Sequence, residues 1–373
     1  GMESTGRPVI GLFGIGSDHY WPQFEGLRAR LEGLISTVAS RVDEAGAQVI
    51  SAGLVDDPRQ AAGVVERFSA ARIQAIFVHV TTYARSYTVL PIVRSMKVPV
   101  VVIALQPTRT LDFDAFNAMG DRGAMTGEWL AHCQAVTAPE ISSVFRRAGI
   151  DFRLVTGYLD QSESWSEIAE WIGALTVARA LESSIVGVLG HADNGMMDLY
   201  TDLTALSATT GCTFEIIEMA EVKSLRSQVA PEQVESKLGE FDSVFEIDPE
   251  CTTEELRRQA LTACALDALV ARRGLGAVAY FYEGNPGSAG QDVVTSIIAG
   301  NSILTTNGVP VAGECDVRTV LAMKMLSVAG AGGAFSEFYY MDFERGHVLL
   351  GHDGPSHLGM ATGRVRLVPL PVF

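Results

Sequence analysis

The stretch from Phe335 to His357, FSEFYYMDFERGHVLLGHDGPSH, gathers side chains that can bind a metal ion or exchange protons. It contains three of the chain's seven histidines, together with several carboxylates. These residues are Glu337, Asp342, Glu344, Asp353, His347, His352 and His357. Carboxylates combined with an imidazole suit Mn²⁺, Mg²⁺ or Co²⁺ better than a thiolate-rich zinc site does. The stretch is therefore either the edge of such a metal site or a solvated β-hairpin.

The alternation of side chains along a β-strand separates these carboxylates. Counting by twos places Glu337 on one face with Tyr339 and Met341, and Asp342 on the opposite face. Because Glu337 shares its face with large side chains, we expect it to be buried, and a buried carboxylate requires a partner or a cation. We expect Asp342 and Glu344 to lie on a solvated face that leads into the turn.

A further carboxylate that can do chemistry follows an apolar strand in AGECDVRT, residues 312–319. Asp316 is placed to cap the helix that comes next, whereas Glu314 precedes the cap. A carboxylate held at the end of a strand is a frequent hard-metal ligand or general base. His352 ends an apolar strand that can return antiparallel beside the strand of Glu337. Glu337 and His352 are therefore candidate ligands of one metal ion, and the residues alone leave the solvated hairpin open as the alternative.

Polar loops follow three of the expected strands. They are GSDHYW (16–21), TTYARSY (81–87) and HADNGMMD (191–198). In open α/β sheets ligands bind at the carboxyl ends of the strands. Each loop taken alone is an ordinary polar loop or part of a site, and the presence of three favours a shared cleft. The first loop sets Asp18 and His19 beside Trp21, an arrangement that suits a sugar, because sugars pack on aromatic faces flanked by hydrogen-bonding groups. The glycines before it do not have the dinucleotide spacing and lack the lysine of a P-loop.

The elements that must position these residues alternate between short apolar runs and amphipathic stretches. The runs are continuously apolar rather than alternating, as expected for parallel sheets covered by helices on both faces. After residue 330 aromatic and β-branched residues alternate with turn signals, which predicts antiparallel strands. We predict an α/β protein with two consecutive Rossmann-like parallel-sheet domains, followed by the start of an antiparallel β domain. The expected boundaries are 1–175, 176–330 and 331–373.

Composition narrows the choice of partner. The chain has 373 residues and a formal net charge of -16, which argues against nucleic acids and anionic membranes because the field repels phosphate. Its five cysteines are scattered, with no paired spacing. This usage suits reduced thiols in a cytoplasmic protein. No signal peptide and no apolar run long enough to span a bilayer is visible in the sequence.

Several of these stretches resemble the L-arabinose isomerase and L-fucose isomerase superfamily, and the arabinose side most. GSDHYW is similar to the family's Gly-Ser-Gln-His-Leu-Tyr loop, and GHADNGMMD to its Gly-Asp-Asn-Met loop. GECDVRTVLAMKML (313–326) resembles the Gly-Glu-Gly-Asp segment and the helix after it. FSEFYYMDFERGHVLLGH (335–352) resembles the Phe-Met-Glu-Asp-Tyr-Thr-Tyr-His-Phe-Glu-Lys-Gly segment and the Gly-Ser-His that follows. This match places Glu337 on the family's second glutamate and His352 on the next histidine.

The resemblance implies a sugar isomerase that interconverts aldoses and ketoses through a cis-enediol, usually with Mn²⁺. It implies that Glu314 and Glu337 bind the metal and move a proton between C1 and C2, with His352 as a further metal ligand. The substrate-binding residues that it implies are Asp18, His19, Trp21, Tyr83, Met196 and Phe281. It also implies a homo-oligomer, a trimer or hexamer, with active sites between subunits.

The chain departs from the family pattern at two positions and in length. Asp18 stands where the family has glutamine, and Met119, in FNAMGDRG (116–123), stands where it has a histidine. The family continues into a longer C-terminal domain with another metal-binding histidine, so we expect this chain to lack most of that domain. These departures support a second hypothesis, a non-catalytic sugar-binding or regulatory protein derived from the same fold.

Overall fold

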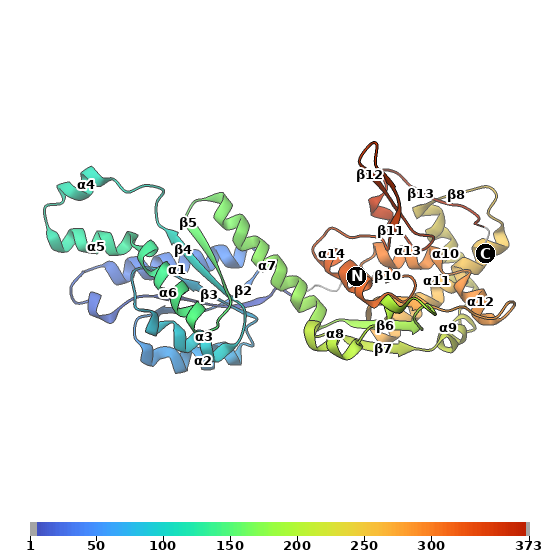
Figure 1. The fold of residues 1–373 in the computed structure, drawn as a ribbon, viewed down its shortest axis with the longest axis horizontal. Coiled ribbons are helices and arrows are strands. Elements are labelled where there is room, and N and C mark those ends of the chain that lie inside the picture. Colours follow the sequence, from blue (N-terminus) through green and yellow to red (C-terminus); the bar gives the residue numbers. More distant parts are fainter. Residues whose placement is uncertain (1–5, 371–373) are drawn as a thin grey trace. The chain divides into compact units, whose positions relative to one another are not determined.

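The structure, a computed structural model, describes residues 6–370, and these fall into two compact units. The N-terminal unit comprises residues 6–176 and the C-terminal unit residues 177–370. Each unit is built on its own parallel sheet, as the continuously apolar runs predicted (Figure 1). No helix within residues 6–370 is both long and apolar enough to cross a lipid bilayer.

The N-terminal unit has a five-stranded parallel sheet of order β2-β1-β3-β4-β5. The strands are β1 (Val9–Ile15), β2 (Gln48–Val55), β3 (Ala75–His79), β4 (Val100–Gln106) and β5 (Phe152–Tyr158). Because β2 and β3 pair with opposite sides of β1, the strand order reverses between β1 and β3. In doubly wound sheets the crevice at such a reversal is the usual ligand site. The loops 16–21 and 81–87 leave the sheet at this point.

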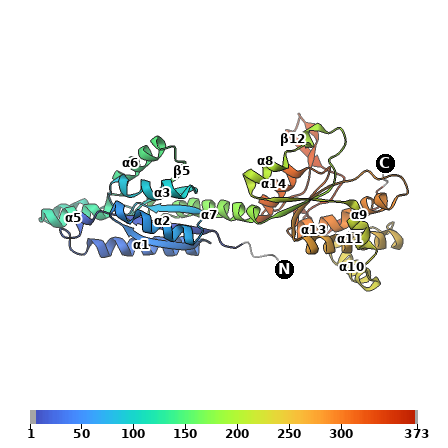
Figure 2. The ribbon, with the colours of Figure 1, turned by 90° about the horizontal axis from the view of Figure 1, so that it is seen from below.

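Helices cover both faces of this sheet. The helices α2 (Ala61–Ala70), α3 (Leu90–Met96) and α6 (Gln134–Arg147) pack on one face, and α1 (Leu27–Glu44) and α7 (Ser162–Glu182) on the other. Figure 2 shows α1 on one side of the strands and α3 and α6 on the opposite side. Between β4 and α6 the chain forms α4 (Phe113–Ala118) and α5 (Arg122–His132). Buried aliphatic residues fill both interfaces, so the strand ends have a rigid support.

The C-terminal unit has a four-stranded parallel sheet of order β10-β9-β6-β7. The strands are β6 (Ile185–Gly190), β7 (Thr213–Ile217), β9 (Leu275–Phe281) and β10 (Val311–Ala312). One face packs on α9 (Met219–Arg226), α11 (Thr253–Arg273), α12 (Ala289–Val294) and α13 (Ile298–Thr306). The other face packs on α8 (Leu203–Thr210), α14 (Val317–Val328) and the last turns of α7. The helix α10 (Pro231–Val244) packs against α11.

The last part of the chain mixes two kinds of strand pairing. The strands β11 (Glu337–Asp342) and β12 (His347–Gly351) form the antiparallel hairpin that the sequence predicted. The strand β13 (Val365–Leu367), however, pairs in parallel with β8 (Phe245–Ile247). Its apolar side chains join the cluster around α10 and α11. The segment after residue 331 thus contributes to the C-terminal unit as well as forming a hairpin.

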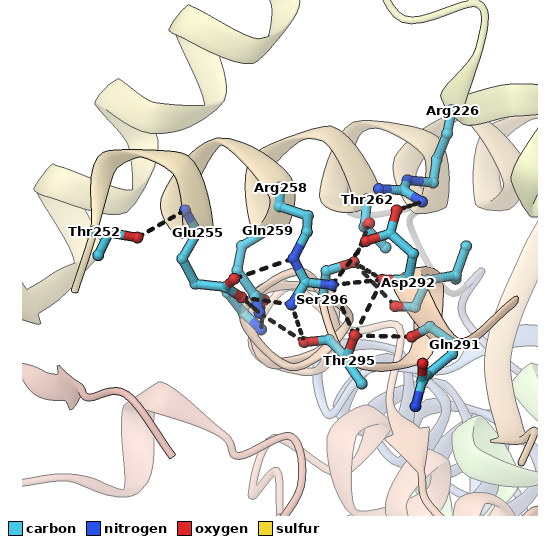
Figure 3. A network of polar contacts seen from close by, with 12 residues as sticks. Arg226, Thr252, Glu255, Arg258, Gln259, Thr262, Gln291, Asp292, Thr295 and Ser296 are labelled. Carbon is cyan, nitrogen blue, oxygen red and sulfur yellow. Dashed lines mark hydrogen bonds and ion pairs between the residues drawn. The ribbon is translucent and has the colours of Figure 1, made fainter. Parts of the chain in front are cut away.

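A polar network fixes α12, which follows the loop after β9. Arg258, on α11, donates to Asp292 Oδ1 at 2.9 Å and to Thr295 Oγ1 at 2.7 Å. Arg226, on α9, donates to Asp292 Oδ2 at 2.5 Å, so one carboxylate joins three helices (Figure 3). Partial burial opposes ionisation, but the two guanidiniums hold the pKa of Asp292 below its usual range. The network restrains the chain just beyond the carboxyl end of β9.

Candidate active site

The carboxyl ends of β6, β9 and β10 are tied together by main-chain hydrogen bonds. His191 N, after β6, donates to Phe281 O at 3.1 Å, and Cys315 N, after β10, donates to Tyr280 O at 3.0 Å. Asp193 N donates to Glu314 O at 3.2 Å, so the loop after β6 is bonded directly to the loop after β10. The loop that starts at His191 and the segment around Glu314 are therefore held in one place at the edge of the sheet.

Gly190 makes the close approach of β6 and β9 possible. Its φ is 88°, and a Cβ at this position would lie 1.9 Å from Phe281 O. No other residue can occupy this place without displacing the main chain of β9. The ring of His191, directly after it, lies edge-on to Phe281 with centroids 5.5 Å apart. The rings of His191 and Phe281 thus pack together at the carboxyl ends of β6 and β9.

Glu314 stands on a strained main chain. Its φ is 57° and that of Cys315 is 59°, a left-handed conformation that costs a residue other than glycine about 1–2 kcal/mol. The predicted cap helps to hold it, since Asp316 Oδ1 accepts from Thr319 N at 2.9 Å. Burial raises the pKa of Cys315 to about 11, so its thiol packs and stays protonated. A strained main chain of this kind persists only where the surrounding structure holds it, and such residues are found most often at active and ligand-binding sites.

His352 meets Glu314 at this edge. Its Nε2 lies 3.4 Å from Glu314 Oε1, and both side chains are largely shielded, with 16% and 22% of their surface exposed. The buried ring of Phe335 lies edge-on to the imidazole with centroids 4.6 Å apart and so orients it. The other ring nitrogen, Nδ1, is buried and has no hydrogen-bond partner within residues 6–370. The imidazole is held against the carboxylate by packing rather than by a second hydrogen bond.

Glu337 differs from the expectation, because its side chain is exposed and not buried. The assignment of faces was also wrong. The register pairs Glu337 with Gly351 and Asp342 with His347, and these partners lie on the same face of β12. A β-bulge at Tyr339 inserts one residue, so the alternation reverses along the strand and brings the two carboxylates to one face.

Tyr339, the bulge residue, is a functional candidate that sequence reasoning missed. Its ring packs on Gly351, where a Cβ would lie 3.0 Å from the ring. Partial desolvation and the negative charges of Asp353, Glu337 and Glu314 together raise the pKa of Tyr339. The phenol therefore lies within electrostatic reach of both predicted catalytic carboxylates and keeps its proton. The alternation pattern gave no signal for this, since a bulge depends on the pairing of both strands.

The predicted donors of the metal site come together only in part. Two donors on one octahedral ion stand roughly 3 Å apart when the metal–oxygen bonds are about 2.1 Å long. The separation of 3.4 Å between Glu314 and His352 fits such a pair. Across residues 6–370, no three carboxylate, imidazole or thiol groups are arranged to hold an ion, so Glu337 does not complete the set in this conformation.

The predicted site residues of the N-terminal unit gather at the reversal between β1 and β3. Trp21 Nε1 donates to Asp56 Oδ2 at 2.7 Å, and the guanidinium of Arg28 lies 5.8 Å from the ring centroid. Asp18 and His19 are exposed and stand 3.7 Å apart. Trp21 therefore supports the loop with its polar edge, while the two residues before it present their side chains to solvent.

Tyr20 links this loop to the next strand end. Its hydroxyl donates to Tyr83 O at 3.2 Å, and burial raises the pKa of Tyr20 to about 12, so the donor stays protonated. Met119, at the end of α4, is 41% exposed. Met196, in the C-terminal unit, is half-buried in the loop whose Asp193 holds Glu314 O. The predicted residues thus form two groups, one within each unit.

Comparisons with known proteins give distant relatives. The chain is 23% identical over 263 residues to the L-arabinose isomerase of Bacillus subtilis, a match that covers 65% of this chain and 47% of the relative. It is 23% identical over 262 residues to the L-arabinose isomerase of Clostridium beijerinckii, covering 66% and 47%. The chain thus spans about half the length of the curated relatives it matches. No protein-family model matches it.

Proposed function

We propose that this chain belongs to a sugar isomerase that resembles L-arabinose isomerase and converts an aldose to a ketose with the help of a divalent metal, most favourably Mn²⁺. The observation that carries the proposal is the pair formed by Glu314 and His352 at the carboxyl edge of three parallel strands. The similarity to two proteins named L-arabinose isomerase supports it independently. A cytoplasmic location and a sugar substrate are parts of the same proposal.

Glu314 and His352 would hold the metal, and Glu337 would join them by a movement of its exposed side chain. When bound, a divalent ion polarises the sugar carbonyl and acidifies the neighbouring C–H. One of the two glutamates, as carboxylate, removes the proton from C2 of the aldose, and the electron pair forms the enediol double bond. The same carboxyl group returns a proton to C1 while a hydroxyl proton passes between O2 and O1. Atoms and charges then balance without a redox partner.

Tyr339 assists as a neutral donor. A phenol keeps its proton at neutral pH, and partial desolvation together with the nearby carboxylates raises the pKa of Tyr339 further, so the hydroxyl can donate a hydrogen bond to a carboxylate or to a sugar oxygen. In this proposal the hydroxyl donates to only one of Glu314 and Glu337, which favours the charged form of that carboxyl group over the other. That difference is what a proton shuttle between adjacent carbons requires.

The decisive test is the Glu314→Gln variant. We expect it to lose Mn²⁺ binding in calorimetry and ketose formation with a panel of aldoses, because the amide carries no charge. The matched control is Glu344→Gln, which alters an exposed carboxylate in the turn between β11 and β12. Wild-type metal binding by Glu314→Gln contradicts the proposal.

A second function, a non-catalytic sugar-binding protein, is favoured by the exposed position of Glu337 and by the departures at Asp18 and Met119. It predicts that aldoses bind equally well with and without Mn²⁺ and that no ketose forms. A calorimetric titration in the presence of a chelator separates the two functions.

We also propose a homo-oligomer, a trimer or hexamer, whose active sites combine the two groups of residues. In it, Asp18, His19, Trp21 and Tyr83 of one copy would face the Glu314–His352 pair of another. The support is that the loop 16–21 and the Glu314–His352 pair belong to different compact units.

A further inference from the structure

The imidazole of His352 is enclosed by main chain as well as by the ring of Phe335. An added Cβ on Gly313 would lie 3.4 Å from its Cε1, and one on Gly354 would lie 2.9 Å from its Nδ1. Both glycines therefore lie directly against the ring. Because Nδ1 has no hydrogen-bond partner in the described part of the chain, the place of the ring depends on how firmly these neighbouring segments are held.

Two hydroxyl groups of α13 anchor the segment that follows β12. Ser356 N donates to Ser302 Oγ at 3.0 Å. Leu358 N donates to Thr306 Oγ1 at 2.9 Å, and His357, between the two donors, has an extended main chain. Four residues of helix rise about 6 Å, close to the roughly 6.6 Å that two extended residues span. The spacing of the two acceptors thus matches that of the two donors and fixes one register.

Both hydroxyls are oriented by the helix that carries them. Ser302 Oγ donates to Ile298 O at 2.8 Å, and Thr306 Oγ1 donates to Ser302 O at 2.8 Å. Since a hydroxyl has one hydrogen, each oxygen is left to the bound N–H group as an acceptor. Ser302 is only 4% exposed, so solvent has little access to this anchor.

One residue separates the first anchor from the glycine that contacts the imidazole. Pro355, between Gly354 and Ser356, is buried, and its ring fixes φ. Leu358, at the second anchor, packs in the apolar cluster around α10 and α11. The main chain of Gly354 is therefore restrained from its C-terminal side by hydrogen bonds and by packing.

We propose that Ser302 and Thr306 are positioning residues for the Glu314–His352 pair. They hold the segment 353–358 so that Gly354 stays against the imidazole and keeps it facing the carboxylate. The inference rests on the proposed metal site, and it assigns a role in that site to a helix that carries none of the proposed ligands. Without the anchors the imidazole would be free to turn away from the carboxylate, and the two donors would lose the separation that suits one ion.

The double variant Ser302→Ala/Thr306→Val tests the inference, because it removes both acceptors with little change in volume. In metal-free protein, NMR measures the Cε1–H resonance of His352, identified by its absence in His352→Ala. We expect this resonance to lose the shift caused by the ring of Phe335 and to move towards that of the exposed His347. We expect the affinity for Mn²⁺, measured by calorimetry, to fall roughly 10-fold. Thr306→Ser keeps the hydroxyl and should match the wild type in both measurements.

Thr210→Val is the matched control for the loss of a threonine hydroxyl. Thr210, at the end of α8, donates to Leu206 O at 2.7 Å and accepts from Cys212 N at 3.3 Å. It thus makes the same two kinds of bond as Thr306 but does not anchor the segment after β12. The control should leave the His352 resonance and the affinity for Mn²⁺ unchanged.

Three results overturn the inference: a wild-type His352 resonance in the folded double variant, an equal shift in Thr210→Val, or a Thr306→Ser variant that behaves like the double variant. Thermal unfolding shows which variants fold, and Thr306→Val alone decides if the double variant does not. If the wild type binds no Mn²⁺, the proposed function fails, whereas the resonance of the metal-free protein still decides whether the two hydroxyls position His352.

Discussion

His352 Nε2 lies 3.4 Å from Glu314 Oε1, although the two residues are 38 positions apart in the chain. The contact joins the end of a β-hairpin to a strained turn after the shortest strand of a parallel sheet. The glutamate is held by its main chain, and the histidine by the ring of Phe335. Each partner is thus oriented by its own support before any ligand binds, which is the condition for a preorganised site.

Removal of the imidazole should weaken metal binding. We expect His352→Ala to lower the affinity for Mn²⁺ by more than roughly 10-fold, since even partners outside the first coordination shell contribute that much. Calorimetric titration of the purified protein measures the effect. His347→Ala, an exposed histidine on the same hairpin, should bind Mn²⁺ as the wild type does. Equal affinities in the two variants would remove His352 from the site.

Loss of the Tyr339 hydroxyl should slow turnover without unfolding the hairpin. Hydrogen bonds to charged groups contribute about 1.5–3 kcal/mol, so Tyr339→Phe is expected to lower kcat by roughly 10- to 100-fold. Because the pKa of Tyr339 is raised, the wild type should show no loss of activity from its ionisation below the ordinary tyrosine range. Tyr340→Phe, on an exposed ring, is the control. An unchanged kcat in Tyr339→Phe refutes the role.

A side chain at Gly190 should disrupt the edge of the C-terminal sheet. The added Cβ would collide with Phe281 O, and the left-handed main chain adds strain, so we expect Gly190→Ala to cost about 2–5 kcal/mol. At Gly195, φ is 94° but no atom lies within 4 Å of an added Cβ. Gly195→Ala should therefore cost only about 1 kcal/mol. Urea unfolding of both variants checks the difference, and equal losses would show that the contact with Phe281 is unimportant.

The network around Asp292 should make the free energy of unfolding depend on pH. Arg226 and Arg258 lower the pKa of Asp292. Their ion pairs with Asp292 therefore stabilise the folded state fully above the ordinary aspartate pKa, and this stabilisation is lost as pH falls through the folded-state pKa. Arg258→Met should be less stable than the wild type at pH 7, and the difference should shrink at about pH 3. Denaturant unfolding at both pH values measures this. A difference that does not change with pH would indicate lost packing instead.

Shared active sites can be tested by mixing inactive variants. Asp18→Ala impairs the proposed sugar loop, and Glu314→Gln impairs the proposed metal pair. If sites form between copies, some sites of a mixed oligomer receive both intact halves, so dissociation and reassociation of the two variants should restore ketose formation. Persistent inactivity of a mixture that has demonstrably exchanged subunits argues against shared sites.

Short-range sequence patterns were sufficient to predict much of the secondary structure. Continuous apolar runs predicted the two parallel sheets, and Asp316 caps its helix as its position after the strand indicated. Gly274 ends α11 with a φ of 62°, a left-handed conformation that glycine adopts readily. These features depend on residues a few positions apart, so the sequence contains all the information that they require.

Other features depend on which distant segments meet, and only the tertiary structure decided them. The bulge at Tyr339 arises from pairing with β12, and it turned Glu337 to a face and an exposure that alternation alone did not predict. The parallel pairing of β13 with β8 also depends on which distant segments meet. The sequence by itself determined the elements and placed Glu314 at a strand end. The meeting of Glu314 with His352 required the packing of Phe335 and the path of the hairpin, because contacts of this range follow from the whole core rather than from any local pattern.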